Sequence, residues 1–365
     1  MRVLVTGASG MLGRETARAL LARGDEVTVL QRRPGGIGCP EVLGDVADAA
    51  VVRRAVVGQD AVVHLAAKVD VVGRWPEFLR ANVIGTRTVA TACRSAGVQR
   101  LVHVSSPAVA HDGQPLVGVG AEPADPAAAR GHYARSKALA EQQALGADSP
   151  DLAVVAIRPH LVWGPGDTQL VEPIVARARA GRLPVIGSGA ALIDTTYIDN
   201  AVAALVAAID AEPAVHGEAL VVSNGEPRPV REVLDRLCRA AGVRGPRVRL
   251  PVPVARAAAV AIERAWTVLD RCDTPPLTPF LVEQLSTAHW FDQRHTRQVL
   301  AWAPHVSLDE GFDRLARWFA TTVTTPCSGS AGQRTRGSRT AALPAVPGEN
   351  LHSTNATSHD TLDSC

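Results

Sequence analysis

The chain begins with short apolar runs that alternate with longer stretches in which apolar residues recur every three or four positions. Val3 to Val5 is a run of the kind that a buried parallel strand requires, whereas 12–22 has the spacing of an amphipathic helix. Further short runs lie at 26–31, 42–45, 60–65, 100–105 and 152–158, and helical spacing lies between them, up to about residue 57, at 76–96 and at 132–145. This order predicts an α/β fold, a doubly wound parallel sheet of Rossmann type.

The pattern changes after residue 168, and this change predicts a second part of the molecule. We expect residues 1–168 to form the Rossmann-type domain, to which some later segments return, and 169–323 to form a smaller C-terminal α/β lobe. From about Thr324 onward Ser, Thr, Gly and Pro dominate. A tail of this composition at 324–365 cannot bury enough apolar surface to offset its ordering entropy, so we expect it to be disordered.

Two further stretches stand out by composition. Residues 107–131 are rich in Pro, Gly, Ala and Asp and have little periodicity, which predicts a loop. Residues 251–269 form a mostly apolar helical stretch interrupted by Arg256, Glu263 and Arg264. This helix either packs on the C-terminal lobe or lies on a membrane surface, and the residues leave both readings open.

Composition and charge narrow the class of protein. The 365 residues carry a formal net charge of +2 without a basic stripe, which argues against nucleic acid as a partner. Six cysteines are scattered without a C-x-x-C pair, which favours reduced thiols over disulfides or a metal site. No signal-peptide pattern precedes the first strand, and no run reaches the roughly 18 apolar residues of a membrane span. We therefore expect a cytoplasmic homodimer, with peripheral contact to a membrane or to a pathway enzyme left open.

Three glycines follow the first strand at a spacing that suits phosphate binding. The first permits a tight turn, the second lets the backbone approach a pyrophosphate, and the third lets the next helix pack on the sheet. That helix would present free N–H groups and its positive dipole end to the phosphates. The pattern predicts a dinucleotide site, although a glycine-rich turn without a ligand is the alternative. The residues expected to line it are Gly7, Ser9, Gly10, Met11, Leu12 and Gly13.

The end of the second strand indicates which dinucleotide binds. Enzymes that prefer NAD place an acidic side chain there, where it accepts hydrogen bonds from the ribose hydroxyls. Here the neutral Gln31 is followed by Arg32 and Arg33. Because a guanidinium can grip a 2′-phosphate, we expect NADP (as NADPH) rather than NAD.

A tyrosine and a lysine four residues apart supply candidate chemistry. Tyr133 and Lys137 lie on one face of a predicted helix, and Ser106 follows the strand at 100–105. Reduction of a ketone needs a proton at its oxygen as hydride reaches its carbon. A tyrosine can donate it if a nearby ammonium brings the phenol pKa down from about 10 toward neutrality. We expect Ser106, rather than the neighbouring Ser105, to hydrogen-bond the same oxygen.

Several motifs together resemble the extended short-chain dehydrogenases/reductases over residues 1 to about 320. They are T-G-A-S-G-M-L-G at 6–13, G-D-V at 44–46, L-A-A-K at 65–68, N-V-I-G-T at 82–86, S-S at 105–106, Y-A-R-S-K at 133–137 and R-P-H-L-V-W-G-P-G-D at 158–167. The branch is similar to the 3β-hydroxysteroid dehydrogenases. S-N-G-E-P at 223–227, P-L-T-P-F-L-V-E-Q-L at 276–285 and the following His289-Trp290 resemble the 2-alkyl-3-oxoalkanoate reductases of olefin and β-lactone pathways.

This resemblance implies roles for individual residues. Ser106, Tyr133 and Lys137 would be the catalytic set, with Asn82 supporting a proton relay. Residues 1–168 would be the NADP-binding domain, and 169–323 would bind the substrate. The further residues implied at the dinucleotide are Asp45, Val46, Ala66, Ala67 and Pro159.

Two departures from the family pattern affect the expected substrate. Val109-Ala110-His111 replaces a V-Y-G triplet, and Leu161 replaces an asparagine that sugar-nucleotide enzymes use near the substrate diphosphate. We therefore expect a hydrophobic substrate, the 3-oxo group of a 2-alkyl-3-oxoalkanoate being reduced to the 3-hydroxy acid. A 3β-hydroxysteroid dehydrogenase and a non-catalytic dinucleotide-binding protein are the alternatives. The second lobe supplies mostly apolar side chains, of which some would line such a pocket and many must be core: Leu161, Val162, Trp163, Leu277, Phe280, Leu281, Val282, Trp290 and Phe291.

Four histidines at 64, 103, 160 and 289 deserve inspection. Their spacing suggests no metal site, and we expect each to be a core or loop residue.

Overall fold

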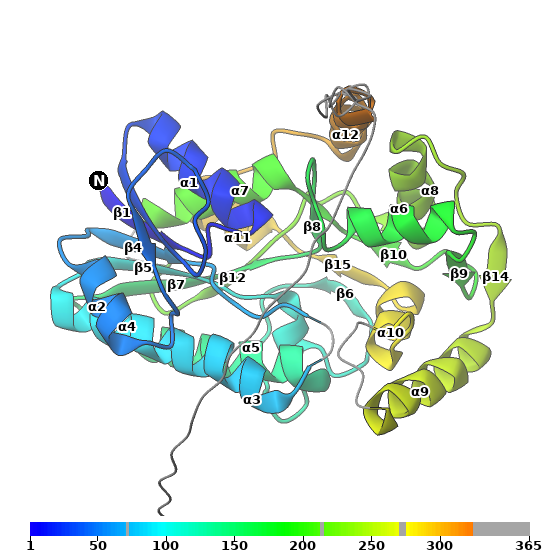
Figure 1. Cartoon of the computed structure of the whole chain (residues 1–365), viewed down its shortest axis with the longest axis horizontal. Helices are drawn as coiled ribbons and strands as arrows, with labels where there is room; N and C mark the ends of the chain where they lie inside the picture. Colours follow the sequence, from blue (N-terminus) through cyan, green and yellow to red (C-terminus); the bar gives the residue numbers. More distant parts are fainter. Residues whose placement is uncertain (71–72, 212–214, 270–274, 324–365) are drawn as a thin grey trace, which may run out of the picture. The chain divides into compact units, whose positions relative to one another are not determined.

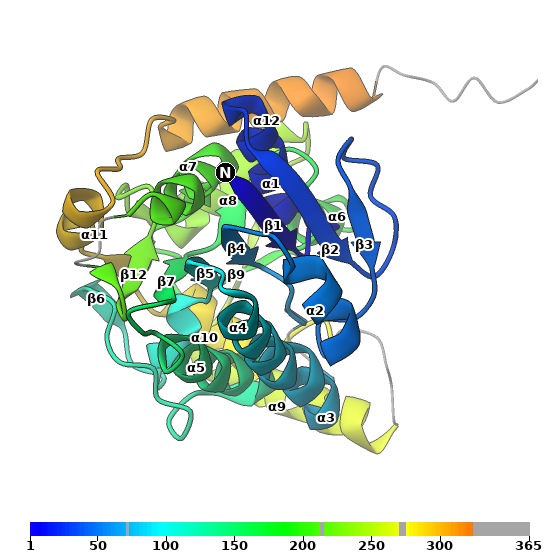
Figure 2. The same ribbon diagram turned by 90° about the vertical axis from the view of Figure 1, so that its left-hand side faces the viewer.

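A seven-stranded parallel sheet forms the centre of the computed structural model, which describes residues 1–70, 73–211, 215–269 and 275–323 (Figure 1). Its strand order is β12-β7-β5-β4-β1-β2-β3, so Figure 2 shows β12 and β3 at opposite edges. The strands are β1 (Arg2–Thr6), β2 (Glu26–Gln31), β3 (Glu41–Leu43), β4 (Ala61–His64), β5 (Arg100–Val104), β7 (Ala153–Pro159) and β12 (Ala219–Val222). The predicted doubly wound sheet is confirmed. The tail that we expected to be disordered lies outside the described residues.

Helices cover both faces of this sheet because successive strand residues point to opposite sides. Val3 and Val5 face α1 (Met11–Arg23) and α7 (Ile198–Ile209), whereas Leu4 faces the other layer. The second layer consists of α2 (Ala49–Val56), α4 (Gly85–Ala96) and α5 (Gly131–Leu145). Strand order reverses between β1 and β4, and open α/β sheets bind ligands at the carboxyl ends of the strands at such a point.

The helical stretch predicted at 76–96 contains a distortion that periodicity did not reveal. It consists of α3 (Trp75–Phe78), a π-helix η1 (Leu79–Ile84) and α4. Asn82 lies in the π-helix, and its side chain is buried against the backbone of Lys68. Single π-turns of this kind often occur at functional sites.

A second, four-stranded sheet has the order β13-β10-β15-β6. Its strands are β6 (Leu116–Val119), β10 (Leu192–Ile193), β13 (Arg228–Pro229) and β15 (His289–Phe291). The prediction of a loop over 107–131 is therefore wrong in part, because that stretch contains β6 and a short 3₁₀ helix η2 (Pro107–Ala110). Gly118 has φ +65° and lies under the Trp290 ring, so β6 depends on a contact with a distant strand.

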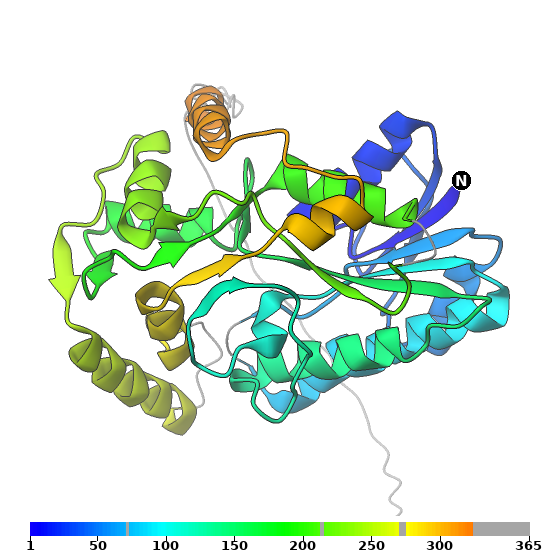
Figure 3. The same cartoon turned by 180° about the vertical axis from the view of Figure 1, so that it is seen from behind.

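Shorter elements complete the fold. They are the strand pairs β8 (Val162–Trp163) with β11 (Thr196–Tyr197) and β9 (Pro184–Ile186) with β14 (Val248–Leu250), and the helices α6 (Val171–Arg179), α8 (Val230–Ala240), α9 (Val252–Val268), α10 (Pro279–Ser286), α11 (Arg294–Val299) and α12 (Leu308–Val323). Figure 3 shows α9 beside α10, and Ala255 and Ala259 of α9 are buried with Val282 of α10. Val254 and Val260 of α9 remain exposed. Among the described helices, none is long and apolar enough to cross a membrane.

Candidate active site

The glycine turn has the geometry that its sequence predicts. Gly7 has φ +78°, donates its N–H to the Leu30 carbonyl at 3.0 Å, and would bring a Cβ within 2.7 Å of the Ala66 nitrogen. A Cβ on Gly13 would lie 2.5 Å from the Gly7 carbonyl oxygen. A Cβ on Gly10 would meet nothing closer than 3.5 Å, so packing within the protein does not require that glycine. A glycine at position 10 would instead be needed where the protein backbone closely approaches a bound pyrophosphate.

The start of α1 fits a pyrophosphate. Gly10 caps the helix without a side-chain hydrogen bond, and the first turn contains no acidic residue. The free N–H groups and the positive helix end are therefore available to an anion. Ser9 beside them is exposed, and Met11 and Leu12 are partly buried. These features fit a dinucleotide at the position that the sequence predicts.

The segment after β2 presents two exposed arginines at the same edge of the sheet. Gln31 is buried, whereas Arg32 and Arg33 are exposed. The carboxylate of Glu41 accepts hydrogen bonds from the backbone N–H groups at 35 and 36, over 2.9 to 3.2 Å. This contact ties the loop that carries the arginines to β3.

The other residues expected around the dinucleotide lie at the carboxyl ends of neighbouring strands. The Ala66 N–H donates to Thr6 Oγ1 at 3.2 Å, which joins the turn after β4 to the end of β1. Val46 is buried against Gly85, where a Cβ would approach its side chain to 2.8 Å. The remaining three are Asp45, which accepts a hydrogen bond from Arg80, Ala67 in the segment after β4, and Pro159 at the end of β7.

Ser106, Tyr133 and Lys137 come together where β5 ends and α5 begins. The Ser106 hydroxyl hydrogen-bonds Tyr133, and burial raises the pKa of that phenol while this bond opposes the shift. Lys137 is 4% exposed and donates from Nζ to the Val104 carbonyl at 2.5 Å. Burial lowers the pKa of Lys137 to about 8, with the Glu141 carboxylate opposing the shift.

The pKa of the Tyr133 phenol differs from our expectation. We expected a nearby ammonium to lower its pKa toward neutrality, but the pKa is raised. The cause is burial, and the ammonium of Lys137 is engaged at the Val104 carbonyl. The phenol is therefore protonated at neutral pH, which is the form that a proton donor needs.

The structure also distinguishes the two serines and places Asn82. The Ser105 hydroxyl is buried without a hydrogen-bond partner among the described residues, whereas Ser106 meets Tyr133. Asn82 donates from Nδ2 to the Lys68 carbonyl at 3.0 Å and to Ser136 Oγ at 2.8 Å. Its contact with α5 is thus through Ser136, one position before the lysine.

Two buried polar contacts near these residues were not predicted from the sequence. A buried ion pair joins Arg158 on β7 to Glu141 on α5, with Nε to Oε2 at 2.8 Å. His64 lies between the hydroxyls of Thr6 and Thr86, at 2.7 and 3.0 Å. No cluster of three metal-ligating side chains occurs in the part of the chain that the structure describes.

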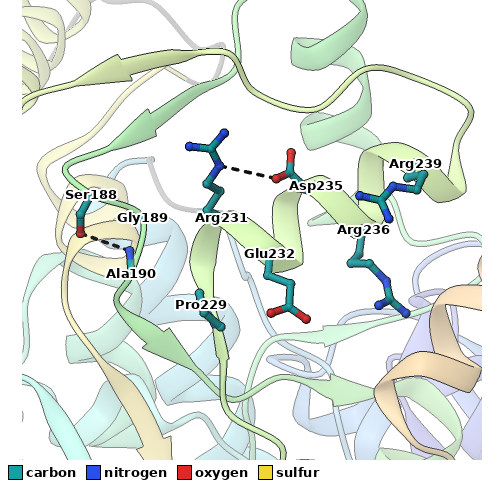
Figure 4. A pocket seen from close by; sticks show the side chains of 9 residues that line it. All are labelled: Ser188, Gly189, Ala190, Pro229, Arg231, Glu232, Asp235, Arg236 and Arg239. Atoms are coloured by element: carbon teal, nitrogen blue, oxygen red, sulfur yellow. Dashed lines mark hydrogen bonds and ion pairs between the residues drawn. The ribbon is translucent and has the colours of Figure 1, made fainter.

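Several apolar residues proposed for the pocket instead belong to the core. Trp163 is fully buried, stacks on Phe312 and donates its indole N–H to Thr195, and Val282 is also fully buried. A cavity of about 500 Å³ lies elsewhere in the lobe, between the turn after β9 and α8 (Figure 4). Its lining contains neither Ser106 nor Tyr133, so we do not assign it to the reaction.

Comparison with known proteins places the chain in a class. Residues 3–223 match the NAD dependent epimerase/dehydratase family, and the chain belongs to that family. It is 42% identical to a 2-alkyl-3-oxoalkanoate reductase of Stenotrophomonas maltophilia, covering 86% of this chain and 98% of the relative. It is 31% identical to the human sterol-4-alpha-carboxylate 3-dehydrogenase, decarboxylating, over 87% of this chain and 88% of that protein. Among solved structures it resembles MoeE5 in complex with UDP-glucose and NAD, with 26% identity, a TM-score of 0.69 and coverage of 89% of this chain and 100% of the other.

Proposed function

We propose that this protein reduces the 3-oxo group of a 2-alkyl-3-oxoalkanoate to a 3-hydroxy acid. The observation that carries the proposal is the contact of Ser106 with Tyr133, one helical turn from the buried Lys137 and at the same sheet edge as the glycine turn. The 42% identity to a 2-alkyl-3-oxoalkanoate reductase over nearly its whole length supports the choice of substrate.

Each residue of this set has a distinct task. When bound, the reduced nicotinamide supplies the hydride that reaches the carbonyl carbon. Ser106 and Tyr133 hold the carbonyl oxygen by hydrogen bonds, and the Tyr133 hydroxyl gives it a proton as negative charge develops there. The Lys137 ammonium stabilises the phenolate that results. The substrate thereby gains a hydride at carbon and a proton at oxygen. A proton from solvent then restores the tyrosine.

We propose NADPH as the preferred cofactor. Arg32 and Arg33 are exposed directly after β2, and no carboxylate occupies the end of that strand to repel a 2′-phosphate. Glu41 steadies the same loop through its backbone N–H groups.

A sterol is the competing substrate, because a sterol-4-carboxylate dehydrogenase is also a relative. Turnover of 2-alkyl-3-oxo acids of increasing chain length is compared with turnover of a 3-oxosteroid, each with NADPH and NADH. We expect the acids to react, with KM falling by up to about fourfold per added methylene until the pocket is full. Turnover of the steroid alone would overturn the substrate assignment and leave the catalytic residues in place.

A further inference from the structure

Arg130 joins three segments of the fold: the start of α5, the segment after η2, and α10. It immediately precedes α5, three residues before that tyrosine. Its Nε donates to the Asp112 carbonyl at 3.0 Å, in the segment that follows Ser106 and η2. Its Nη1 donates to Glu283 Oε1 on α10 at 2.7 Å. One guanidinium thus contacts the catalytic serine's loop and the C-terminal lobe from the start of the catalytic helix.

Part of this guanidinium remains available to a ligand. The Arg130 side chain is 52% exposed, and among the described residues its Nη2 has no partner. Gly113 provides the space for it, because a Cβ there would lie 2.7 Å from Nη2. Gly113 also has φ +99°, so another residue would be strained as well as obstructed. The loop is therefore shaped around the guanidinium.

The nearby carboxylates do not fully neutralise the positive charge of Arg130. Glu283 is almost buried and faces two cations, Arg130 at 2.7 Å and Arg256 at 3.9 Å. The Asp112 carboxylate is exposed and accepts a hydrogen bond from the Gln114 N–H, so only its carbonyl meets Arg130.

A buried, uncharged imidazole lies on the inner side of the same loop. His111 is 2% exposed, and its ring nitrogens have no partner among the described residues. Burial lowers the pKa of this imidazole, while the charge of Glu283 opposes the shift. Of His111 and Arg130, the two basic side chains of this loop region, only Arg130 is therefore a cation with a free donor among the described residues.

We propose that Arg130 binds the carboxylate of the substrate acid through Nη2 and thereby selects acids over neutral ketones. This inference rests on the proposed function. In a 3-oxo acid the carboxylate is two bonds from the carbonyl carbon, so the proposal requires that a cation three residues before the tyrosine hold the carboxylate while the carbonyl oxygen meets Ser106 and Tyr133. Hydrogen bonds between a guanidinium and a carboxylate are among the strongest in proteins, and their geometry orients the bound group. Arg130 would then determine specificity without taking part in proton transfer.

The test compares an acid with its own ester. The stable 2-alkyl-3-hydroxy acid and its methyl ester are oxidised to the 3-oxo compounds by the wild-type enzyme with whichever oxidised nicotinamide it uses. Arg130→Met is expected to raise KM for the acid by about 10- to 100-fold, the range for loss of a charge-assisted hydrogen bond. Kinetics with the ester should change less than about threefold. Arg130→Lys should keep part of the preference, and Arg135→Met, an exposed arginine of the same helix stacked on Trp75, is the matched control.

Glu283→Gln separates carboxylate binding from a structural link between α5 and α10. If Arg130 binds substrate, this variant leaves KM for the acid unchanged or lower, because a competing carboxylate is gone. If Arg130→Met and Glu283→Gln each weaken turnover of the acid and of the ester equally, the role of Arg130 is structural. That result would overturn this inference but not the proposed function. Turnover of neither compound by the wild-type enzyme would overturn the proposed function as well. Thermal unfolding of each variant reports whether it folds.

Discussion

At the scale of single residues, the proposed reaction depends on the Tyr133 phenol being protonated. Burial raises the pKa of Tyr133, so the proton it would donate is present at neutral pH. Tyr133→Phe removes that proton and little else. We predict that the variant still binds NADPH, measured by nucleotide fluorescence titration, while its turnover falls by about 10²- to 10⁴-fold. Near wild-type turnover would remove Tyr133 from its role.

The proposed preference for NADPH is also a residue-scale property, because it is argued from the side chains after β2. The exposed Arg32 is expected to pair with a 2′-phosphate that NADH lacks. We predict that Arg32→Ala lowers kcat/KM with NADPH and leaves that with NADH nearly unchanged. Steady-state kinetics with both cofactors measure the ratio, and equal kcat/KM values in the wild-type enzyme would contradict the preference.

At the scale of elements, α5, which carries Tyr133 and Lys137, is held on the sheet by a buried ion pair. Glu141 of α5 and Arg158 of β7 are both almost inaccessible, and Arg158 also donates from Nη1 to the Glu122 carbonyl at 2.6 Å. Glu141→Gln leaves the guanidinium without its counter-charge, so we predict a loss of about 3–5 kcal/mol in the free energy of unfolding. Urea denaturation measures it. The double variant Glu141→Leu/Arg158→Met should recover most of the loss, because it leaves no unpaired buried charge. No recovery would mean that the ion pair itself stabilises the fold.

At the scale of the whole molecule, buried imidazoles make stability depend on pH. Burial lowers the pKa of His64 and His289 to about 3 and that of His160 to about 4, from 6.5. Between these values and pH 6.5 the unfolded chain binds protons that the folded chain does not. Above pH 6.5 these imidazoles do not affect the free energy of unfolding. Below pH 6.5 each one lowers it by up to about 1.4 kcal/mol per pH unit.

One buried carboxyl acts in the opposite direction. Burial raises the pKa of Asp194 from 3.8 to about 6, so its stabilising contribution is present at low pH and is lost as pH rises through 6. Three imidazoles outweigh this single group. We predict that the urea midpoint falls as pH decreases from 7 to 5, and that His160→Asn reduces the slope. A midpoint independent of pH over that range would contradict the assignment of neutral, buried histidines.

The sequence by itself determined the parts of this protein that depend on local patterns. The apolar run of β1, the glycines at 7, 10 and 13, and the alternation of strands and helices each carry their information within about twenty residues. Since hydrophobic periodicity and glycine conformation act over one or two turns, these elements and the dinucleotide turn could be predicted. The spacing of Tyr133 and Lys137 is local in the same sense.

Tertiary structure alone decided what depends on residues far apart in the chain. β6 forms because β15, more than 150 residues later, pairs with it and covers Gly118, and the π-helix at Asn82 accompanies contacts with Lys68 and Ser136. The position of Arg130 likewise follows from Glu283 on a distant helix. Such contacts leave no periodic signal in the sequence, because their energy comes from burial and charge pairing that exist only once the chain has folded.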